Sequence, residues 1–443
     1  MTNELTITWE MPDPPAQASK DHLWESSPME SSPLEKRLCW PVGTLQVLHK
    51  AFRHGLDRFT RWDLSQVSDE SPYIQASCIF RRGVEHSASK AQTLSSSYLI
   101  RLVDEQPQFL DQVAIIDQNV AEAWSLKPHP GHLWIAIDEL SKSLDTVATV
   151  IEFLRKHTAT PLVAIVGGGV LCDTVAFACA LAERPFNLIP TTLLSMVDAC
   201  VGGKTGVNFE PYGKNQLGRF AFPEEVMVWA DWLKTLDPRD YRSGIAECVK
   251  HGLLVKQASL LNSIPTGVYD PSLQDILIEI IEVKARVVSE DPSEIGRRAS
   301  LNLGHTFAHG LESLSHKNRP KDYLRHGEAV GIGLGFMAVL SHQAGVLSQD
   351  SRDQVLQVLK DQKLLLSQKV LETYLGLGDL RSQESRTQIY GKLTQDKKNK
   401  DGAIHWILLE ELGSVYQKDG QFTCSVSRST FETAFDQFVA LLP

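Results

Sequence analysis

Residues 161–182 read "PLVAIVGGGVLCDTVAFACALA" and combine an apolar run, three glycines and a helical pattern. A buried strand followed by a glycine turn and a helix is typical of a mostly parallel α/β sheet. Glycine lets the backbone approach a pyrophosphate, and the next helix offers its first N–H groups to the anion. Three adjacent glycines are not the dinucleotide-binding fingerprint. The alternative that this stretch is a simple tight turn, with Asp173 as a helix cap, therefore stays open.

The same alternation extends on both sides of this stretch, from residue 96 to residue 235. Strands are predicted within 111–120, 132–138 and 186–194, and a helix over 143–157. After residue 236 helical periodicity dominates, apart from a small hairpin near "QFTCSV" and a closing helix over 428–442. The predicted fold class is α/β, with a Rossmann-like N-terminal domain over 96–235 and a mainly α-helical C-terminal domain over 236–443. Residues 1–95 are expected to be a divergent, partly disordered extension, and the cleft between the domains to be the site.

Composition excludes several classes of protein. The 443 residues are 42% hydrophobic and 22% charged, with a net charge of −10. This acidity argues against general nucleic-acid or membrane-surface binding, and no apolar run reaches the length of a membrane span. The N-terminus lacks a hydrophobic signal core, and the seven cysteines show no C-x-x-C spacing, so a cytoplasmic location is predicted.

The most informative polar pattern is "LNLGHTFAHGLE" at residues 301–312. Asn302, His305 and His309 follow one another at spacings of three and four, which places them on one face of a helix. A solvent-facing helix with two ordinary histidines is the alternative. Combined with Glu247 in "GIAECVKHG" and His326 in "RHGEAVGIG", His305 completes a Glu/His/His set that leaves a fourth metal position free. Three protein ligands and one open position are typical of catalytic zinc.

Cations concentrate in and beside these motifs, although the protein as a whole is acidic. The stretch "PTTLLSMVDACVGGKTGVNFEPYGKN" at 190–215 carries two Gly-Lys units among apolar residues. A convergent basic set in an acidic protein indicates a small polyanion, such as a phosphorylated acid. Its members are Lys204, Lys214, Lys250, Lys284, Arg298 and Lys397 or Lys398.

In chain order these motifs, with "YGKNQLG" and "DKKNKDGAIHWILL", resemble the sugar phosphate cyclases, and most closely the 3-dehydroquinate synthase family, from about Asp117 to the C-terminus. The resemblance implies that Glu247, His305 and His326 bind a divalent metal, Zn²⁺ or else Co²⁺. It implies an NAD site lined by Asp117, Asn119, Glu139, Lys142, Gly168, Gly169, Asp173, Thr191, Thr192 and Thr235, with Lys204 and Lys214 where cofactor and substrate meet. It places Asp198, Asn215, Lys250, Lys284, Arg298, Asn302, His309 and Lys397 around the substrate, and Arg184 at its phosphate across the interface of a homodimer. Two departures from the family pattern are Cys172 and Ala308, where glycine is usual.

The implied reaction converts 3-deoxy-arabino-heptulosonate 7-phosphate into 3-dehydroquinate and phosphate. It proceeds through transient oxidation by NAD, phosphate elimination, re-reduction, ring opening and aldol closure, with no net redox change. The protein would then be an NAD- and metal-dependent carbon–oxygen lyase of the shikimate pathway, acting on a small-molecule heptulose phosphate.

Four alternatives stay open. A cyclase acting on sedoheptulose 7-phosphate, in cyclitol formation for secondary metabolism, and a 2-deoxy-scyllo-inosose-type synthase both use substrates without a carboxylate, whereas Lys284 and Arg298 suit one. A metal- and NAD-dependent polyol dehydrogenase would not need the phosphate-binding cations. In a non-catalytic binding protein we expect the metal-binding residues to be replaced, whereas Glu247, His305 and His326 are all present here.

Overall fold

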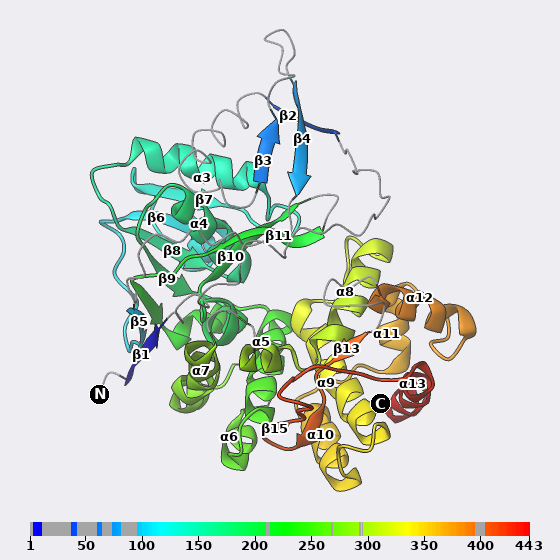
Figure 1. Cartoon of the computed structure of the whole chain (residues 1–443). Helices are drawn as coiled ribbons and strands as arrows, with labels where there is room; N and C mark the ends of the chain where they lie inside the picture. The colour runs from blue at the N-terminus through cyan, green and yellow to red at the C-terminus, as the bar shows by residue number, and fades with distance from the viewer. Residues whose placement is uncertain are drawn as a thin grey trace, which may run out of the picture.

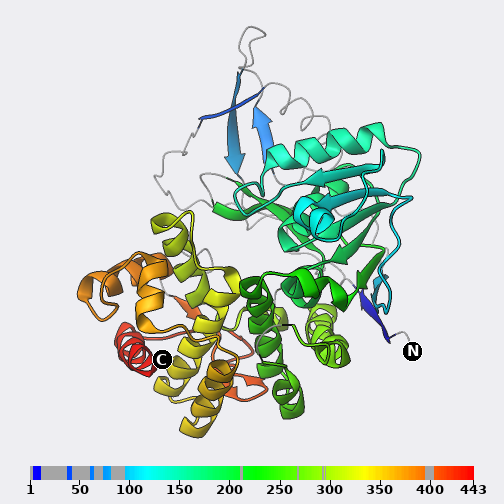
Figure 2. The same cartoon turned by 180° about the vertical axis from the view of Figure 1, so that it is seen from behind.

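The structure is a computed structural model that describes residues 3–10, 37–41, 60–63, 73–80, 95–209, 213–266, 269–291, 294, 296–394 and 404–443. A sheet-containing N-terminal half and a helical C-terminal half lie side by side, as the views from the front and from behind both show (Figures 1 and 2). The α/β fold class predicted from the sequence is confirmed by this arrangement.

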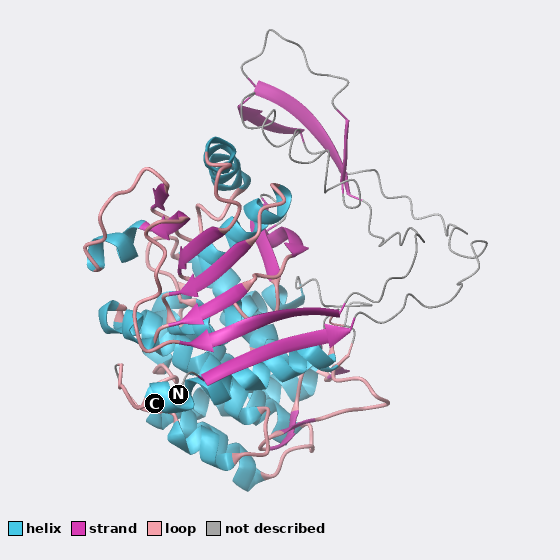
Figure 3. Cartoon of the chain, turned by 90° about the vertical axis from the view of Figure 1, so that its left-hand side faces the viewer, coloured by secondary structure: helices cyan, strands magenta, loops and turns pink. Residues whose placement is uncertain are grey.

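The N-terminal half is organised around a seven-stranded sheet with the order β1-β5-β12-β9-β8-β6-β7. Its strands, side by side in Figure 3, are β1 (Asn3–Glu10), β5 (Ser95–Leu102), β6 (Val113–Asp117), β7 (His132–Ile135), β8 (Val163–Gly167), β9 (Phe186–Pro190) and β12 (Glu225–Val228). All neighbouring pairs are parallel except β1 with β5. The carboxyl ends of β6, β8 and β9 therefore meet at one edge, which is where parallel sheets bind ligands.

Strand β1 corrects the expectation that the beginning of the chain is poorly ordered. It pairs antiparallel with β5 along its whole length, from Asn3 opposite Leu102 to Glu10 opposite Ser95. The sequence alternates apolar and polar residues here, with Leu5, Ile7 and Trp9 two apart, which is the period of a half-buried strand.

A second, three-stranded sheet is formed by β2 (Arg37–Pro41), β4 (Tyr73–Phe80) and β3 (Thr60–Asp63), in the order β2-β4-β3. These strands lie in the extension of residues 1–95, where the sequence analysis predicted no strand. The apolar spacing of residues 45–59 is helical, but this stretch lies outside the described residues.

Short helices and a hairpin complete the N-terminal half. They are α2 (Gln118–Ala123), α3 (Leu144–Lys156), α4 (Gly169–Leu181), the π-helical turn η1 (Ser195–Ala199), the hairpin β10 (Lys204–Phe209) and β11 (Gly213–Phe220), and the 3₁₀ turn η2 (Ala230–Thr235). Gly168 is the N-cap of α4, so the alternative in which Asp173 merely caps this helix is wrong. The hairpin carries Lys204 and Lys214, the lysines of the two Gly-Lys units.

The C-terminal half is mainly helical, as predicted. Its helices are α5 (Pro238–Leu253), α6 (Ala258–Ser263), α7 (Leu273–Glu290), the 3₁₀ turn η3 (Arg297–Asn302), α8 (His305–Asn318), α9 (His326–Gln343), α10 (Gln349–Asp361), α11 (Gln368–Leu375), α12 (Gln383–Thr394) and α13 (Arg428–Leu441). Two short antiparallel pairs lie before α13, namely β13 (His405–Trp406) with β16 (Cys424–Ser425), and β14 (Leu409–Glu411) with β15 (Ser414–Val415).

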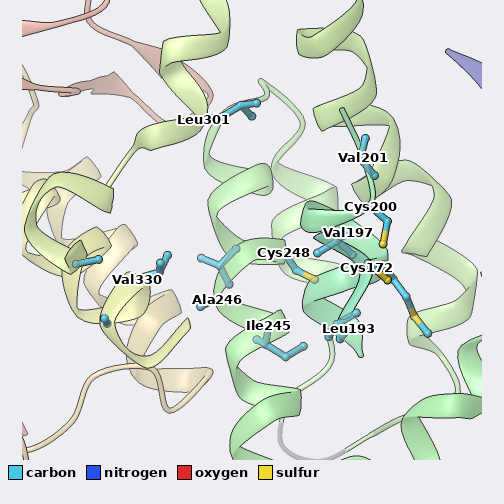
Figure 4. Close-up of a cluster of buried hydrophobic side chains, with 14 of the residues drawn as sticks. Cys172, Leu193, Val197, Cys200, Val201, Ile245, Ala246, Cys248, Leu301 and Val330 are labelled. Carbon is cyan, nitrogen blue, oxygen red and sulfur yellow. The ribbon is translucent and has the colours of Figure 1, made fainter. Parts of the chain in front are cut away.

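Close packing joins the two halves and brings α5, α8 and α9 together. Figure 4 shows Val197 of η1 next to Cys248 of α5, in a buried cluster that also includes Cys172 and Cys200. In α9 a Cβ atom at Gly327 would lie 2.2 Å from backbone atoms of Ser243 in α5. A Cβ atom at Gly333 would lie 2.2 Å from the backbone oxygen of Gly304, which precedes α8. Only glycine permits these approaches, which fix the three helices that carry the predicted metal ligands.

None of the helices in the part of the chain that the structure describes has the length and apolar character needed to cross a bilayer.

Candidate active site

The three predicted metal ligands converge although they lie on three separate helices. Nε2 of His305 and Nε2 of His326 lie 3.5 and 3.4 Å from the same oxygen of Glu247. Two ligands about 2.1 Å from a zinc ion at a tetrahedral angle are separated by about 3.4 Å. Glu247 is fully buried; its Oε2 forms an ion pair with Lys250, and its Oε1, which faces the two imidazoles, has no hydrogen-bond partner of good geometry among the described residues. Buried carboxylate oxygens of this kind fit a metal ligand.

The electrostatics of this triad suit a cation. Although burial raises the pKa of Glu247, the charge of Lys250 and the two histidines hold it well below its usual range. Burial and Lys250 lower the pKa of His305 to about 4, so its imidazole is neutral and free to coordinate. Burial lowers the pKa of His326, but Glu312 and Glu247 together raise it to about 10. The two carboxylates, which face opposite nitrogens of the His326 ring, therefore favour positive charge at this site.

A buried charge network adjoins the triad on α5 and α7. Lys250 forms an ion pair with Glu247 and lies 3.5 Å from Oδ1 of Asp198. Lys284 lies 2.9 Å from the same Oδ1 and donates a hydrogen bond of 2.6 Å to the backbone oxygen of Asp198. Although burial raises the pKa of Asp198, Lys250 and Lys284 hold it well below its usual range.

His251 also faces Asp198, with Nε2 3.8 Å from Oδ1. Burial and Lys250 lower the pKa of His251 to about 3, so this ring is neutral. Asp198, Glu247 and His251 could hold a metal ion by distance alone. However, the ammonium group of Lys250 already contacts both carboxylates and supplies the positive charge there.

The carboxylate of Glu294 links two predicted substrate residues. Glu294 forms an ion pair with Lys204 of β10 and accepts a hydrogen bond of 3.4 Å from Nδ2 of Asn302. Arg298 is buried, donates from Nη2 to the backbone oxygen of Gly202 at 3.0 Å and lies over the ring of Phe220. These contacts fix Arg298 next to the glycine turn that begins the hairpin.

His309 lies beside the triad, one helical turn after His305. Its ring centroid is 5.5 Å from that of His305 and 6.3 Å from that of His326. The predicted polar face of α8 therefore lines the site, and the surface-helix alternative is wrong.

The hairpin β10–β11 carries the remaining predicted lysines to the helical half. Nζ of Lys214 lies 3.5 Å from Oε1 of Glu312 in α8 and 3.9 Å from Oε1 of Glu139. Asn215 is exposed, and its backbone N–H donates to Oδ1 of Asn208 at 2.8 Å. Asn208 also donates to both the backbone and the side-chain oxygen of Glu139, which holds the hairpin on the loop before α3.

The predicted cofactor residues gather at the carboxyl edge of the sheet. Asp117 ends β6 and caps α2 by accepting from the N–H of Asn119, which is exposed. Gly168 and Gly169 follow β8, and Thr191 and Thr192 follow β9. A Cβ atom at Gly168 would lie 3.1 Å from the side chain of Thr192, and one at Gly169 would lie 3.1 Å from Ala199. The buried hydroxyl of Thr191 has no hydrogen-bond partner among the described residues, as expected for a group that awaits a ligand.

Two further pairs flank this edge. Lys142 lies 2.6 Å from Oδ2 of Asp173, and burial raises the pKa of that carboxyl group despite the lysine. Thr235 accepts a hydrogen bond of 3.0 Å from Nε1 of Trp124, within a cluster that includes Trp229 and Trp232.

Arg184 does not join the site of its own chain. Its guanidinium donates to the backbone oxygens of Leu154, His157, Thr160 and Pro161. It lies just before β9, at the amino edge of the sheet, opposite to the glycine turn. Its predicted role across a homodimer interface stays a prediction. Lys397 and Lys398 lie outside the described residues.

Sequence reasoning missed four residues of this site: Asn208, His251, Glu294 and Glu312. It also took Lys284 as a cation awaiting a substrate anion, whereas Asp198 already pairs with it. Glu312 had a visible signal, because it continues the series 302, 305, 309 by three residues. Glu294 had none, because it pairs with a lysine 90 positions away.

Comparison with known proteins decides the family. Two family models match consecutive parts of the chain, "3-dehydroquinate synthase N-terminal" over residues 132–243 and "3-dehydroquinate synthase C-terminal" over residues 244–399. A 3-dehydroquinate synthase of Methylacidiphilum infernorum is 35% identical over 348 residues, covering 73% of this chain and 92% of the relative. This chain belongs to the 3-dehydroquinate synthase family. It is therefore an enzyme of the NAD- and metal-dependent, phosphate-eliminating cyclases, as its sequence predicted.

A further relative by sequence and two solved structures are also similar to this chain. The enzyme of Paracoccus denitrificans is 39% identical over 289 residues, which cover 63% of this chain and 76% of that enzyme. Among solved structures, 2-epi-5-epi-valiolone synthase of Streptomyces hygroscopicus, with NAD⁺ and Zn²⁺ bound, is 26% identical, with a TM-score of 0.62 over 80% of this chain and 99% of that one. A 2-deoxy-scyllo-inosose synthase, 21% identical with a TM-score of 0.63 over 77% of this chain and 97% of that one, shares the fold.

Proposed function

We propose that this chain converts 3-deoxy-arabino-heptulosonate 7-phosphate into 3-dehydroquinate and phosphate. Its cofactors would be NAD and a divalent metal, for which Zn²⁺ is favoured over Co²⁺. The observation that carries the proposal is the triad of the buried Glu247 and His305 and the partly exposed His326, set against the network of Lys250, Lys284 and Asp198. The similarity to 3-dehydroquinate synthases supports the proposed reaction. The structural neighbour with bound NAD⁺ and Zn²⁺ supports the proposed cofactors.

The charges of the site favour a phosphorylated acid. Lys142, Lys204, Lys214, Lys250 and Lys284 each have a carboxylate partner among the described residues. A divalent ion at the triad would carry more positive charge than the one carboxylate ligand, Glu247, neutralises, so an anionic substrate would be drawn to it.

The residues of the chain divide the work of binding and orientation. Arg298 and Lys284 form the wall assigned to the substrate carboxylate, and Lys204 and Asn215 lie on the hairpin assigned to the phosphate. His309 lies beside the triad and Asn302, three residues before His305, contacts Glu294, and both would orient the hydroxyl groups of the sugar. Lys250 holds Asp198 and Glu247 in place, so the substrate meets donors that need little reorganisation. When bound, NAD exchanges a hydride with the substrate and the metal ion polarises the hydroxyl group that is oxidised.

A second candidate is a cyclase of sedoheptulose 7-phosphate. The match to 2-epi-5-epi-valiolone synthase, over 99% of that chain, favours it. The identity of 35% to 39% with 3-dehydroquinate synthases, and the retention of Asn302, His309 and Arg298, favour the first. A homodimeric state and a cytoplasmic location belong to the same proposal.

The deciding experiment offers both heptulose phosphates in parallel to the protein supplied with NAD and Zn²⁺, and identifies the carbocycle by mass spectrometry. We expect phosphate release from the deoxyheptulosonate at a higher kcat/KM. Arg298→Ala should lower that value about 30- to 1,000-fold, because a charge-assisted contact is lost, and affect any turnover of sedoheptulose 7-phosphate far less. A wild-type preference for sedoheptulose 7-phosphate would move the protein to the second candidate.

A further inference from the structure

Glu312 extends the polar face of α8 one step beyond the residues that the sequence singled out. It follows His309 by three positions and is 6% exposed. A buried carboxylate is costly unless charged partners surround it. Among the described residues Glu312 has two ion-pair partners, Lys214 and His326, which come from different parts of the chain.

The first partner is the metal ligand His326. Nδ1 of His326 lies 3.2 Å from Oε2 of Glu312, while Nε2 of the same ring lies 3.4 Å from Oε1 of Glu247. If Nδ1 carries the proton and donates it to Glu312, the lone pair of Nε2 is directed at the triad. A carboxylate behind a ligating histidine fixes the tautomer and the orientation of the ring, and it raises the ligand's basicity.

The second partner is Lys214 of β11. Its Nζ lies 3.5 Å from Oε1 of Glu312 and 3.2 Å from Nε2 of His316, which lies one turn further along α8. Since β11 belongs to the sheet-containing half and α8 to the helical half, Glu312 joins the two. The hairpin that carries Lys204 and Asn215 is thereby tied to the metal site.

We propose that Glu312 is a positioning residue that orients the metal ligand His326 and, through Lys214, couples the metal site to the hairpin β10–β11. The inference rests on the proposed function, because it takes Glu247, His305 and His326 as the metal site. Beyond that function, we infer that the carboxylate of Glu312 governs both the affinity for the metal ion and the placement of the hairpin lysines that meet the substrate.

The main test is Glu312→Gln, which keeps the shape of the side chain and removes its charge. The matched control is Glu372→Gln in α11, a half-buried carboxylate that accepts from the N–H of Leu380 at 3.0 Å and from Gln368 at 2.7 Å. The dissociation constant for Zn²⁺ is measured by competition with a chromogenic chelator, and the Co²⁺-loaded proteins are compared by visible absorption. We expect E312Q to bind Zn²⁺ about 10- to 100-fold more weakly with a shifted Co²⁺ spectrum, and E372Q to match the wild type.

Coupling to the hairpin is tested with Lys214→Gln. We expect K214Q to raise KM for the heptulose phosphate while changing the Zn²⁺ dissociation constant less than about threefold. In the double variant E312Q/K214Q the rise in KM should not exceed that of E312Q alone, because the two residues act as one unit. Fully additive effects on KM would overturn the coupling.

Wild-type Zn²⁺ affinity and an unchanged Co²⁺ spectrum in E312Q would overturn the positioning role. If E312Q does not fold, Glu312→Asp decides by the same two measurements, because it keeps the charge but withdraws it from Nδ1 of His326. A wild-type protein that binds no metal, or a His305→Ala variant that keeps it, would instead refute the metal site and with it the proposed function.

Discussion

The metal triad and the hairpin β10–β11 face the same site but are built in opposite ways. Glu247 is fully buried on α5, and the glycines of α9 press the helices that carry His305 and His326 together. Lys204, by contrast, begins the hairpin with half of its side chain exposed and an ion pair to Glu294. The triad is rigid because the core holds it, whereas the lysine is held by one carboxylate near the surface.

This difference suggests how the site divides its tasks. A buried, fixed triad suits a resident cation, because little reorganisation is needed when the ion binds. An exposed lysine that is paired with a carboxylate can exchange that partner for a substrate phosphate at small cost, since surface ion pairs contribute little. Changes in the triad should therefore remove function outright, and changes in the hairpin should weaken binding without harming the fold.

The largest effect is expected from His305→Ala. The variant loses one of three ligands in a site that offers no described replacement at the same distance. We expect no stoichiometric Zn²⁺ after dialysis and a fall in kcat of about 1,000-fold or more. Metal analysis and the rate of phosphate release check this expectation. Full zinc content in the variant would show that His305 is not a metal ligand.

An intermediate effect is expected from Asp198→Asn, which leaves Lys284 without the carboxylate that faces it. We expect the free energy of unfolding at pH 7 to fall by about 2–3 kcal/mol. The pKa of Asp198 is depressed in the folded state, so its charge stabilises the protein above the unfolded pKa of about 3.9. That stability is lost as the pH falls further toward the folded pKa.

The difference between wild type and D198N should therefore narrow as the pH is lowered from about 4, by up to about 1.4 kcal/mol per pH unit. Urea unfolding at several pH values measures it. A difference that is independent of pH would mean that Asp198 acts by packing and not by charge, and the contrast between the buried network and the hairpin would be weaker.

The smallest effect on the protein itself is expected from Lys204→Gln. Since the side chain is half exposed and its ion pair lies near the surface, the melting temperature should stay within about 2 °C of the wild type. Loss of a cation that meets the substrate should still lower kcat/KM about 10- to 100-fold. A large drop in melting temperature with unchanged kinetics would reverse the roles assigned to the hairpin and the core.

The sequence predicted the parts of this molecule whose signals are local or periodic. The strand and glycine turn at 161–169 and the helix after it follow from apolar runs and spacing, and the face of α8 with His305 and His309 follows from helical periodicity. The convergence of His326 with this face depends on close glycine contacts between helices, which no spacing reveals. It was suggested by residue chemistry and by the family resemblance.

What the sequence could not reveal are charge pairs between distant positions. Asp198 meets Lys284 across 86 residues and Lys204 meets Glu294 across 90, so each lysine looked like a cation awaiting a substrate. Strand β1 was missed for another reason: its alternating pattern is short, and its partner β5 follows only after a long insertion. In each case the fold supplies the partner.

We propose that NAD works here as a catalyst and is not consumed. The most direct measurement follows phosphate release and absorbance at 340 nm together while the zinc-loaded protein with NAD acts on 3-deoxy-arabino-heptulosonate 7-phosphate. We expect each active site to release many phosphates without lasting accumulation of NADH, and the carbocycle to have the mass of 3-dehydroquinate. NADH that accumulates in step with substrate consumed, or substrate oxidised with its phosphate still attached, would contradict it and indicate a dehydrogenase.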